Sequence, residues 1–306
     1  MSIIEANLHA IATTKTQHTE SKVWQVIIIG SGFAGLGAAI KLREAGIHDF
    51  IVLEKSNELG GVWRENTYPG CACDVPSALY SYSFAPNPNW SRVFAEQAEI
   101  KAYLQQTARD YGVIPHIQMQ QEMTDSAWDE QAKLWRITTA QQQYQARFVI
   151  MACGPMHEPV YPKINGINDF KGTIFHSARW QHEIDLTGKR VAVIGSGASA
   201  IQFVPKIQPK VAKLVLFQRT PQWVLPKMDQ TLSPLMHQLF KRLPLTQLAM
   251  RGAIFSVFEA LNGSMHHPKI MQQFQRLALF NLQKTVKDPV LRQKLTPKFI
   301  IGCKRV

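Results

Sequence analysis

The sequence predicts an α/β fold made of two similar units, with a helical insertion in the second unit. In each unit a short apolar strand runs into a turn of small residues, and the pattern of a helix follows the turn. The turns are Gly30-Ser-Gly32-Phe-Ala-Gly35 and Gly195-Ser-Gly197-Ala-Ser-Ala200. A strand, a turn of this spacing and a helix are together typical of Rossmann-like dinucleotide-binding domains. Two such domains in one chain indicate electron transfer between two nucleotide cofactors.

The composition is that of a folded protein with about two domains of ordinary size. Of the 306 residues, 45% are apolar and 18% are charged, which excludes a disordered chain. The four cysteines form no C-x-x-C pair, and the sequence suggests neither a disulfide framework nor a metal site. The start lacks the pattern of a secretory signal, so we expect a cytoplasmic protein. The expected boundaries are a disordered leader at 1–21, a first dinucleotide-binding domain at 22–155 and a second at 156–306.

In the first unit, an apolar run at 23–29 predicts the strand before the turn, and residues 34–45 predict the helix after it. Gly30 allows the tight turn, Gly32 lets a pyrophosphate approach the backbone, and Gly35 lets the helix pack closely on the strand. The next predicted strand, at 50–53, ends at Glu54. An acid at this place accepts hydrogen bonds from a ribose and repels a 2′-phosphate, so the site suits FAD or NAD rather than NADP.

The second unit repeats this arrangement with the opposite charge at its end. Strands are predicted at 191–194 and 213–217, with a helix reaching about residue 204 between them. Arg219 follows the second strand, where an NAD site carries an acid. A guanidinium there binds a 2′-phosphate through charge-assisted hydrogen bonds, so the second site is expected to take NADP(H). The residues expected to contact this cofactor are Gly195, Ser196, Gly197, Ala198, Ser199, Ala200, Arg219 and Thr220.

The segment between the two units carries the spacing F-x-G-x-x-x-H-x-x-x-W, at Phe170, Gly172, His176 and Trp180. This spacing resembles the fingerprint of the Baeyer–Villiger monooxygenases, which are class B flavoprotein monooxygenases. Members usually have Pro or Asp where this chain has Gln181. By this resemblance His176 lies in a hinge between the nucleotide domains and organises their motion, rather than transferring a proton itself.

The segment after the first unit strengthens the resemblance. It contains G-G-x-W, Y-P-G and C-D, ending at Trp63, Gly70 and Asp74, as these enzymes do. The resemblance implies that Trp63 and Asp74 lie beside the flavin and that Asp74 also approaches the nicotinamide. Phe33, Val62 and Tyr80 are further expected cofactor contacts. The related dithiol reductases hold two cysteines four residues apart here, whereas Cys71 and Cys73 are two apart, so we expect packing residues and no redox pair.

The last residues, Gly302-Cys-Lys304-Arg305, match the G-x-K-R motif of the same enzymes. The resemblance implies that Arg305 is the catalytic arginine, that Asp74 tunes it, and that Lys304 helps to hold NADP. Members of the family continue for more than a hundred further residues, so we expect this chain to lack the C-terminal part of the FAD domain.

The formal charge of +12 is concentrated late in the chain. Residues 232–298 carry ten of the 34 lysines and arginines but two of the 22 acids. Leucines at helical spacing, such as Leu235, Leu239 and Leu243, predict a helical insertion at about 230–298. We expect its apolar face to be buried against the NADP domain, and a helix lying on a membrane surface is the alternative. A nucleic-acid binder is disfavoured because no recognisable motif accompanies the charge.

The resemblance implies an FAD- and NADPH-dependent monooxygenase that acts through a peroxyflavin. It inserts one oxygen atom of O2 into a ketone or aldehyde and gives an ester or lactone. An N- or S-oxygenating flavin monooxygenase is one alternative, although its fingerprint ends in Tyr or Phe where this chain has Trp180. A truncated, inactive remnant that binds NADP weakly and loses flavin is the other. The identity of the carbonyl substrate and the oligomeric state stay open.

Overall fold

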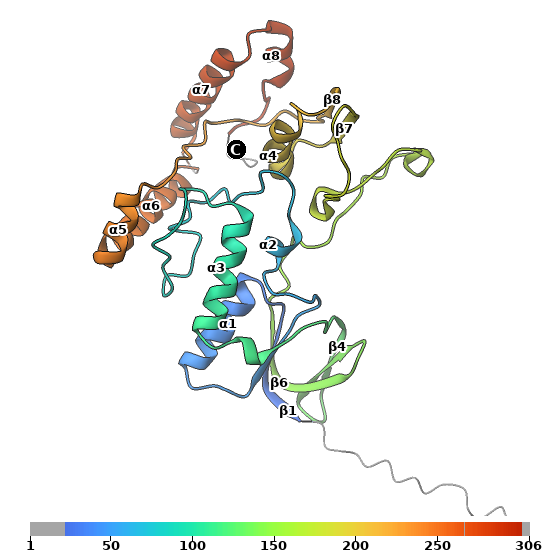
Figure 1. Ribbon diagram of the computed structural model, residues 1–306, viewed down its shortest axis with the longest axis vertical. Coiled ribbons are helices and arrows are strands. Elements are labelled where there is room, and N and C mark those ends of the chain that lie inside the picture. The colour runs from blue at the N-terminus through green and yellow to red at the C-terminus, as the bar shows by residue number, and fades with distance from the viewer. Residues whose placement is uncertain (1–21, 266, 302–306) are drawn as a thin grey trace, which may run out of the picture.

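The computed structural model describes residues 22–265 and 267–301. Its elements form two α/β units with a group of helices beside them, as the sequence predicts (Figure 1). The predicted leader at 1–21 and the predicted site residues Lys304 and Arg305 lie outside the described residues.

The first unit is built on a six-stranded mixed sheet. Its strands are β1 (Val23–Ile29), β2 (Phe50–Leu53), β3 (Ile117–Gln118), β4 (Met123–Asp129), β5 (Leu134–Thr139) and β6 (Gln143–Met151). They lie in the order β3-β2-β1-β6-β5-β4, and the neighbouring pairs β3–β2, β2–β1 and β1–β6 are parallel. The pairs β4–β5 and β5–β6 are antiparallel. The parallel part carries the first glycine-rich turn, which begins where β1 ends.

The apolar runs of β1 and β2 are buried on both faces of this sheet. Val26 and Ile28 pack in the same cluster as Leu36 of helix α1 (Phe33–Glu44) and Leu104 of helix α3 (Gln97–Asp110). The alternate residues, such as Ile27, point to a second cluster on the other face. Because successive side chains of a strand point to opposite faces, a continuous β-branched run suits a strand covered on both sides. Helices α1 and α3 lie together beside the sheet (Figure 1).

The second unit is smaller. Strands β7 (Arg190–Ile194) and β8 (Lys213–Phe217) form a parallel pair, and helix α4 (Ala198–Ile207) connects them. Three apolar residues of α4 are buried, namely Ala200, Phe203 and Ile207. The predicted strand at 213–217 is confirmed residue for residue, whereas α4 continues three residues beyond the predicted end.

The helical insertion consists of α5 (Pro234–Arg242), α6 (Pro244–Ser264), α7 (Pro268–Thr285) and α8 (Pro289–Leu295). Each helix has proline in its first turn. Proline is favoured there because the first amides of a helix have no partner within the helix and its fixed φ suits the helix. The prediction of helices over this segment is confirmed. Within residues 22–301, position 266 aside, no helix is long and apolar enough to cross a membrane.

The predicted burial of this insertion against the second unit is wrong for α5 and α6. Leu235 of α5 and Leu243, which lies between the two helices, are exposed, and both helices instead bind loops of the first unit. Gln247 donates to the Asn87 carbonyl at 2.6 Å, and Arg251 donates to the carbonyls of Ala78, Leu79 and Ser81 at 2.8, 3.1 and 3.1 Å. Loop carbonyls without strand partners require donors, and these polar side chains supply them.

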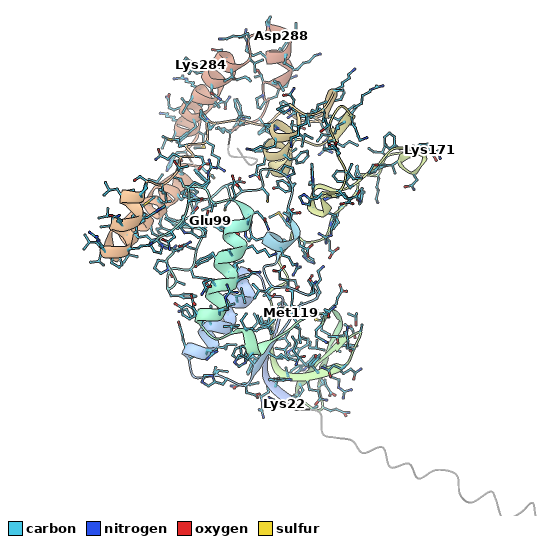
Figure 2. The ribbon with its side chains drawn as sticks, viewed as in Figure 1. Lys22, Glu99, Met119, Lys171, Lys284 and Asp288 are labelled. Atoms are coloured by element: carbon cyan, nitrogen blue, oxygen red, sulfur yellow. The ribbon has the colours of Figure 1, made fainter. Side chains whose placement is uncertain are left out.

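Helix α7 follows the prediction more closely. Its Met271 and Ala278 are buried in a cluster with Trp223 and Ile301. Trp223 comes soon after β8, so this part of the insertion does pack on the second unit. The exposed end of α7 and the start of α8 carry Lys284 and Asp288 (Figure 2).

Candidate dinucleotide-binding sites

The first glycine-rich turn is packed so tightly that two of its glycines leave no room for a side chain. A Cβ on Gly35 would lie 1.8 Å from the Gly30 carbonyl oxygen, and one on Gly30 would lie 2.8 Å from the Ala152 carbonyl oxygen. Gly30 also has a φ of +100°, which only glycine adopts without strain. These contacts hold the start of α1 directly over the end of β1.

A second pair of glycines meets this turn from the following segment. A Cβ on Gly61, whose φ is +55°, would lie 3.0 Å from the Cα of Gly32. The Gly60 amide donates to the Ser31 carbonyl at 3.1 Å. No side chain caps the N-terminus of α1, whose N-cap residue is Gly32. Bare backbone from both segments therefore surrounds the helix N-terminus, an arrangement that suits the close approach of a phosphate.

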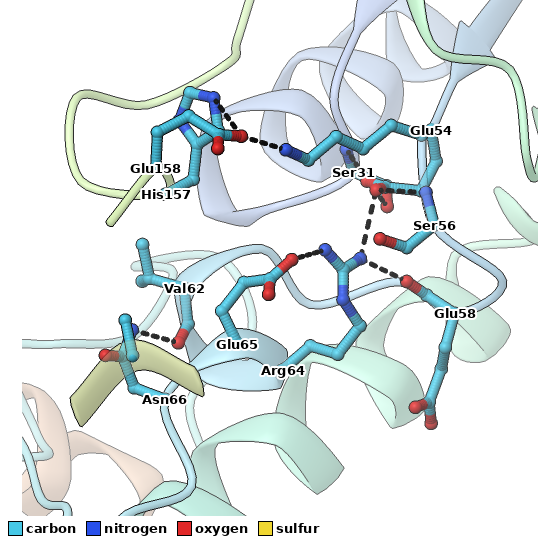
Figure 3. A network of polar contacts seen from close by, with 12 residues as sticks. Ser31, Glu54, Ser56, Glu58, Val62, Arg64, Glu65, Asn66, His157 and Glu158 are labelled. Atoms are coloured by element: carbon cyan, nitrogen blue, oxygen red, sulfur yellow. Dashed lines mark hydrogen bonds and ion pairs between the residues drawn. The ribbon is translucent and has the colours of Figure 1, made fainter. Parts of the chain in front are cut away.

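Glu54 lies at the end of β2, as predicted, and its carboxylate is buried among donors of the chain itself (Figure 3). It accepts from the Ser31 amide at 2.9 Å and hydroxyl at 2.6 Å, and from the Ser56 amide at 3.0 Å. It also forms an ion pair with Arg64 at 2.9 Å. Burial would raise the pKa of Glu54, but the hydrogen bonds and the Arg64 charge hold that pKa below its ordinary value.

Glu54→Gln is expected to destabilise the fold near neutral pH by about 1–2 kcal/mol. The reason is that the amide cannot accept hydrogen bonds from all the groups that donate to the carboxylate. The pKa of Glu54 is lower in the fold than its ordinary value of 4.5. Ionised Glu54 therefore stabilises the fold fully above pH 4.5, and the contribution is lost as the pH falls through the folded-state pKa. Urea unfolding at a series of pH values should show the two proteins converging below pH 4.5. A constant difference down to pH 3 would contradict this.

A wall of aromatic side chains stands beside the same turn. The ring of Phe33 meets Tyr80 edge-on, with 4.8 Å between ring centres. The Trp63 indole nitrogen donates to the Tyr80 hydroxyl at 3.1 Å, and burial, opposed by this hydrogen bond, raises the pKa of Tyr80. Trp63 and Val62 belong to a short helix, α2 (Val62–Glu65), which the sequence does not predict. Four residues are too few for a helical period to show in the sequence.

The two cysteines behave as expected of packing residues. Cys71 and Cys73 are both buried in the core of the first unit. Burial raises the pKa of the Cys71 thiol to about 11, so it stays protonated and unreactive near neutral pH.

Asp74 lies where the two units meet. Its carboxylate accepts from the Gln202 amide nitrogen of α4 at 3.0 Å. Gln202 also donates to the Ala72 carbonyl at 2.9 Å and accepts from the Tyr68 hydroxyl at 2.9 Å. One side chain thus fastens the segment from Tyr68 to Asp74 onto the helix that begins at the second turn. Gln202 was not among the predicted site residues, because a glutamine inside a helix gives no signal of a contact more than a hundred residues away.

The second turn opens onto a hollow of about 590 Å³. The residues that line it come from the ends of β7 and β8 and the segments that follow them: Ile194, Gly195, Ser196, Gly197, Phe217, Gln218, Arg219, Thr220 and Gln222. None of these is acidic. Gln218 donates to the Ser196 hydroxyl at 2.8 Å and so joins the two segments. The predicted residues Ala198, Ser199 and Ala200 form the first turn of α4, whose N-terminus has no side-chain cap.

A second hollow of about 600 Å³ adjoins the first and shares Arg219 and Thr220 with it. Its other lining residues include Lys294 and Lys298 at the end of the helical insertion. The described residues that line this hollow therefore include three cations and no acid. The lysines were not among the predicted site residues, because they come more than ninety residues after the second turn.

The fingerprint residues of the linker fall into two groups. Phe170 and Gly172 lie far out on the linker, next to Lys171 at its tip (Figure 2). Trp180 lies against Phe203 of α4, with 5.2 Å between ring centres. His176 accepts from the Ala178 amide at 3.1 Å through Nδ1 and meets the ring of Tyr161. Burial and the neighbouring Arg179 lower the pKa of His176, which fits a neutral, structural imidazole.

Comparison with known proteins gives consistent relatives. Residues 27–257 match the family described as pyridine nucleotide-disulphide oxidoreductase. A Baeyer–Villiger monooxygenase of Streptomyces coelicolor is 49% identical over 92% of this chain. An oxidised steroid monooxygenase bound to NADP superimposes with a TM-score of 0.82 at 30% identity, covering 93% of this chain and 62% of its own. A complex of OTEMO with FAD and NADP gives 0.82 at 29%, covering 94% and 62%.

The chain spans about half the length of the curated relatives it matches. The alignment covers 54% of the Streptomyces protein.

Proposed function

Because the chain belongs to the Baeyer–Villiger monooxygenases, within the pyridine nucleotide-disulphide oxidoreductase family, we propose that it acts as an FAD- and NADPH-dependent monooxygenase. The proposed reaction inserts one oxygen atom of O2 into a ketone or aldehyde and gives an ester or lactone. The observation that carries the proposal is the opposite charge at two similar sites, Glu54 at the first and Arg219 at the second, with Asp74 between the units that hold them.

The residues of the first site fit FAD. The bare backbone at Gly32 and Gly61 leaves space for a pyrophosphate at the N-terminus of α1. Glu54 is the proposed ribose acceptor, and its low pKa keeps it ionised at neutral pH. Phe33, Val62, Trp63 and Tyr80 are proposed contacts of the cofactor, since they adjoin the same turn.

The residues of the second site fit NADP(H). The hollow along the second turn contains Arg219 and Thr220 and is free of acids among its described lining residues. A guanidinium and a hydroxyl here suit a 2′-phosphate. Lys294 and Lys298 of the adjoining hollow add positive charge on the same side. The selectivity for a phosphorylated dinucleotide is proposed to arise from this group of cations.

When bound, the nicotinamide supplies a hydride and the flavin supplies the reaction with O2. The chain's own task is to hold the two cofactors against each other and to exclude water. Gln202 and Asp74 bind the segment of the first unit to α4 of the second, so they are proposed to fix this arrangement. Arg305 as the catalytic arginine, tuned by Asp74, and Lys304 as an NADP contact rest on the Gly302-Cys-Lys304-Arg305 match alone.

The proposal is tested with the purified chain supplied with FAD. We expect a bound flavin spectrum, oxidation of NADPH in preference to NADH, and an ester or lactone from a panel of ketones, detected by mass spectrometry. The same reaction with a thioether separates this enzyme class from S-oxygenating relatives. A sulfoxide formed without any ester, or a protein that takes up no FAD, would contradict the proposal.

A further inference from the structure

A chain of alternating charges leads from the first nucleotide site to the linker between the two units. Glu54 pairs with Arg64 at 2.9 Å, Arg64 pairs with Glu65, and Glu65 pairs with Arg179 at 2.7 Å (Figure 3 shows its inner part). The exposure of the side chains falls along this series from 40% at Arg179 through 13% and 11% to 4% at Glu54. The series therefore runs from solvent into the core and ends on the carboxylate at the first site.

Arg179 also closes the base of the linker. We define the linker loop as residues 157–179. Its two ends meet where Arg179 donates to the His157 carbonyl at 3.1 Å. The next residue, Glu158, pairs with Lys55, which directly follows Glu54 in the chain. Both ends of the loop are thus fastened within one or two residues of the first nucleotide site, and the rest of the loop extends away from the units (Figure 1).

We propose that Arg179 is a positioning residue whose pairing with Glu65 couples the linker loop to the occupancy of the first site. The proposal rests on the proposed function, because it takes Glu54 as the acceptor of a dinucleotide ribose. Arg179 stands at an unspecified position of the fingerprint spacing, next to Trp180.

The direction of the coupling follows from competition for shared partners. Arg64 lies between two carboxylates, Glu54 and Glu65. A hydroxyl that donates to Glu54 competes with Arg64 for that carboxylate. The ion pair of Arg64 with Glu54 is then weakened, and its ion pair with Glu65 becomes stronger. Glu65 then holds Arg179 less strongly. Filling the first site is therefore expected to loosen the base of the linker loop, and by linkage a loose base favours filling.

The cofactor-free protein tests this chain of charges by cleavage of the linker loop with chymotrypsin at the exposed Phe170. Glu54→Gln imitates the loss of charge at the first site, and we expect it to speed cleavage by about threefold or more. In an Arg179→Ala background, where cleavage is already fast, Glu54→Gln should add nothing. Arg179→Lys should restore part of the protection. Lys163→Ala, a change of an exposed cation in the same loop, should behave like the unaltered protein.

Two equal accelerations by Glu54→Gln, with and without Arg179, would overturn the coupling, as would an unchanged rate in both backgrounds. Should Glu54→Gln fail to fold, Arg64→Met tests the same link with the opposite sign. This substitution removes the competing ion pair of Arg64 with Glu65, so Glu65 should hold Arg179 more strongly and cleavage of the linker loop should slow. Faster cleavage would overturn the proposal.

Titration with FAD, followed by flavin fluorescence, provides the second arm. Arg179→Ala should bind FAD about threefold more tightly than the unaltered protein, whereas a merely structural loss would weaken binding. Equal or weaker binding by Arg179→Ala would count against the coupling. If the unaltered protein takes up no FAD at all, the proposed function fails, and the cofactor-free cleavage still decides whether Arg179 couples the loop to Glu54.

Discussion

Gly35→Ala is expected to destabilise the first unit by about 4 kcal/mol or more, a size that point substitutions reach only through severe packing faults. The new Cβ would lie 1.8 Å from the carbonyl oxygen and 2.9 Å from the carbonyl carbon of Gly30. Both atoms are backbone, so no side chain can turn aside. Relief requires α1 to move away from β1, which separates Leu36 from the buried face of the sheet. Urea unfolding monitored by tryptophan fluorescence measures the loss.

The matched control is Gly252→Ala in α6. Gly252 is also a helical glycine, but a Cβ there meets no atom within 4 Å. Alanine at an open helical position is expected to stabilise the protein by about 0.5–1 kcal/mol, because it lowers the entropy lost on folding. Opposite signs for the two substitutions would assign the effect at Gly35 to the contact with Gly30. Equal, small effects would show that α1 adjusts its position freely.

The sequence predicts the framework of the two units well because the strands are continuous apolar runs bounded by polar or glycine residues. Residues 50–53 and 213–217 were expected as strands and are strands with those bounds. Each run is followed at once by Glu54 or Gln218, and such a change of polarity marks a strand end clearly. The spacing of Gly30, Gly32 and Gly35 adds local information, since the contact of Gly35 with Gly30 lies within a single strand-turn-helix unit.

Contacts between distant segments could not be predicted in the same way. The leucine spacing at 235–243 correctly indicates a helix, yet periodicity says nothing about which surface a helix packs on, and Leu235 and Leu243 are exposed. What fixes this part of the insertion is Arg251, whose three carbonyl partners lie about 170 residues earlier. The sequence gives no sign of the ion pair between Glu65 and Arg179 either, because each residue alone has the pattern of an ordinary charged surface residue.

For Glu54 the sequence predicts the position of the side chain but not its hydrogen-bond and ion-pair partners. The sequence predicts an acid at the end of β2 and a role in binding a ribose. It does not predict that Ser31, Ser56 and Arg64 already surround the carboxylate. A ligand that donates a hydrogen bond to this carboxylate is therefore expected to do so alongside the donors that the chain already supplies.

Arg219→Ala is expected to lower the affinity for NADP+ by about 10- to 100-fold, in keeping with the roughly 1.5–3 kcal/mol of a hydrogen bond to a charged group. Arg219 lines both hollows beside the second turn. NAD+ lacks the 2′-phosphate and should lose little affinity on the same substitution. Isothermal titration of the two dinucleotides into the cofactor-free protein measures the difference, and added salt should reduce it, because it arises from charge.

Lys213→Ala serves as the control, since it removes an exposed cation from the opposite end of β8. Lys213→Ala removes the same unit of positive charge as Arg219→Ala but no residue that lines the hollow. The preference for NADP+ should therefore stay unchanged. Lys298→Ala is expected to give an intermediate loss, because Lys298 lines only the second hollow. If Arg219→Ala weakens NADP+ and NAD+ equally, the guanidinium acts on a part that both dinucleotides share. The contrast between Glu54 and Arg219 would then no longer account for a preference between the two.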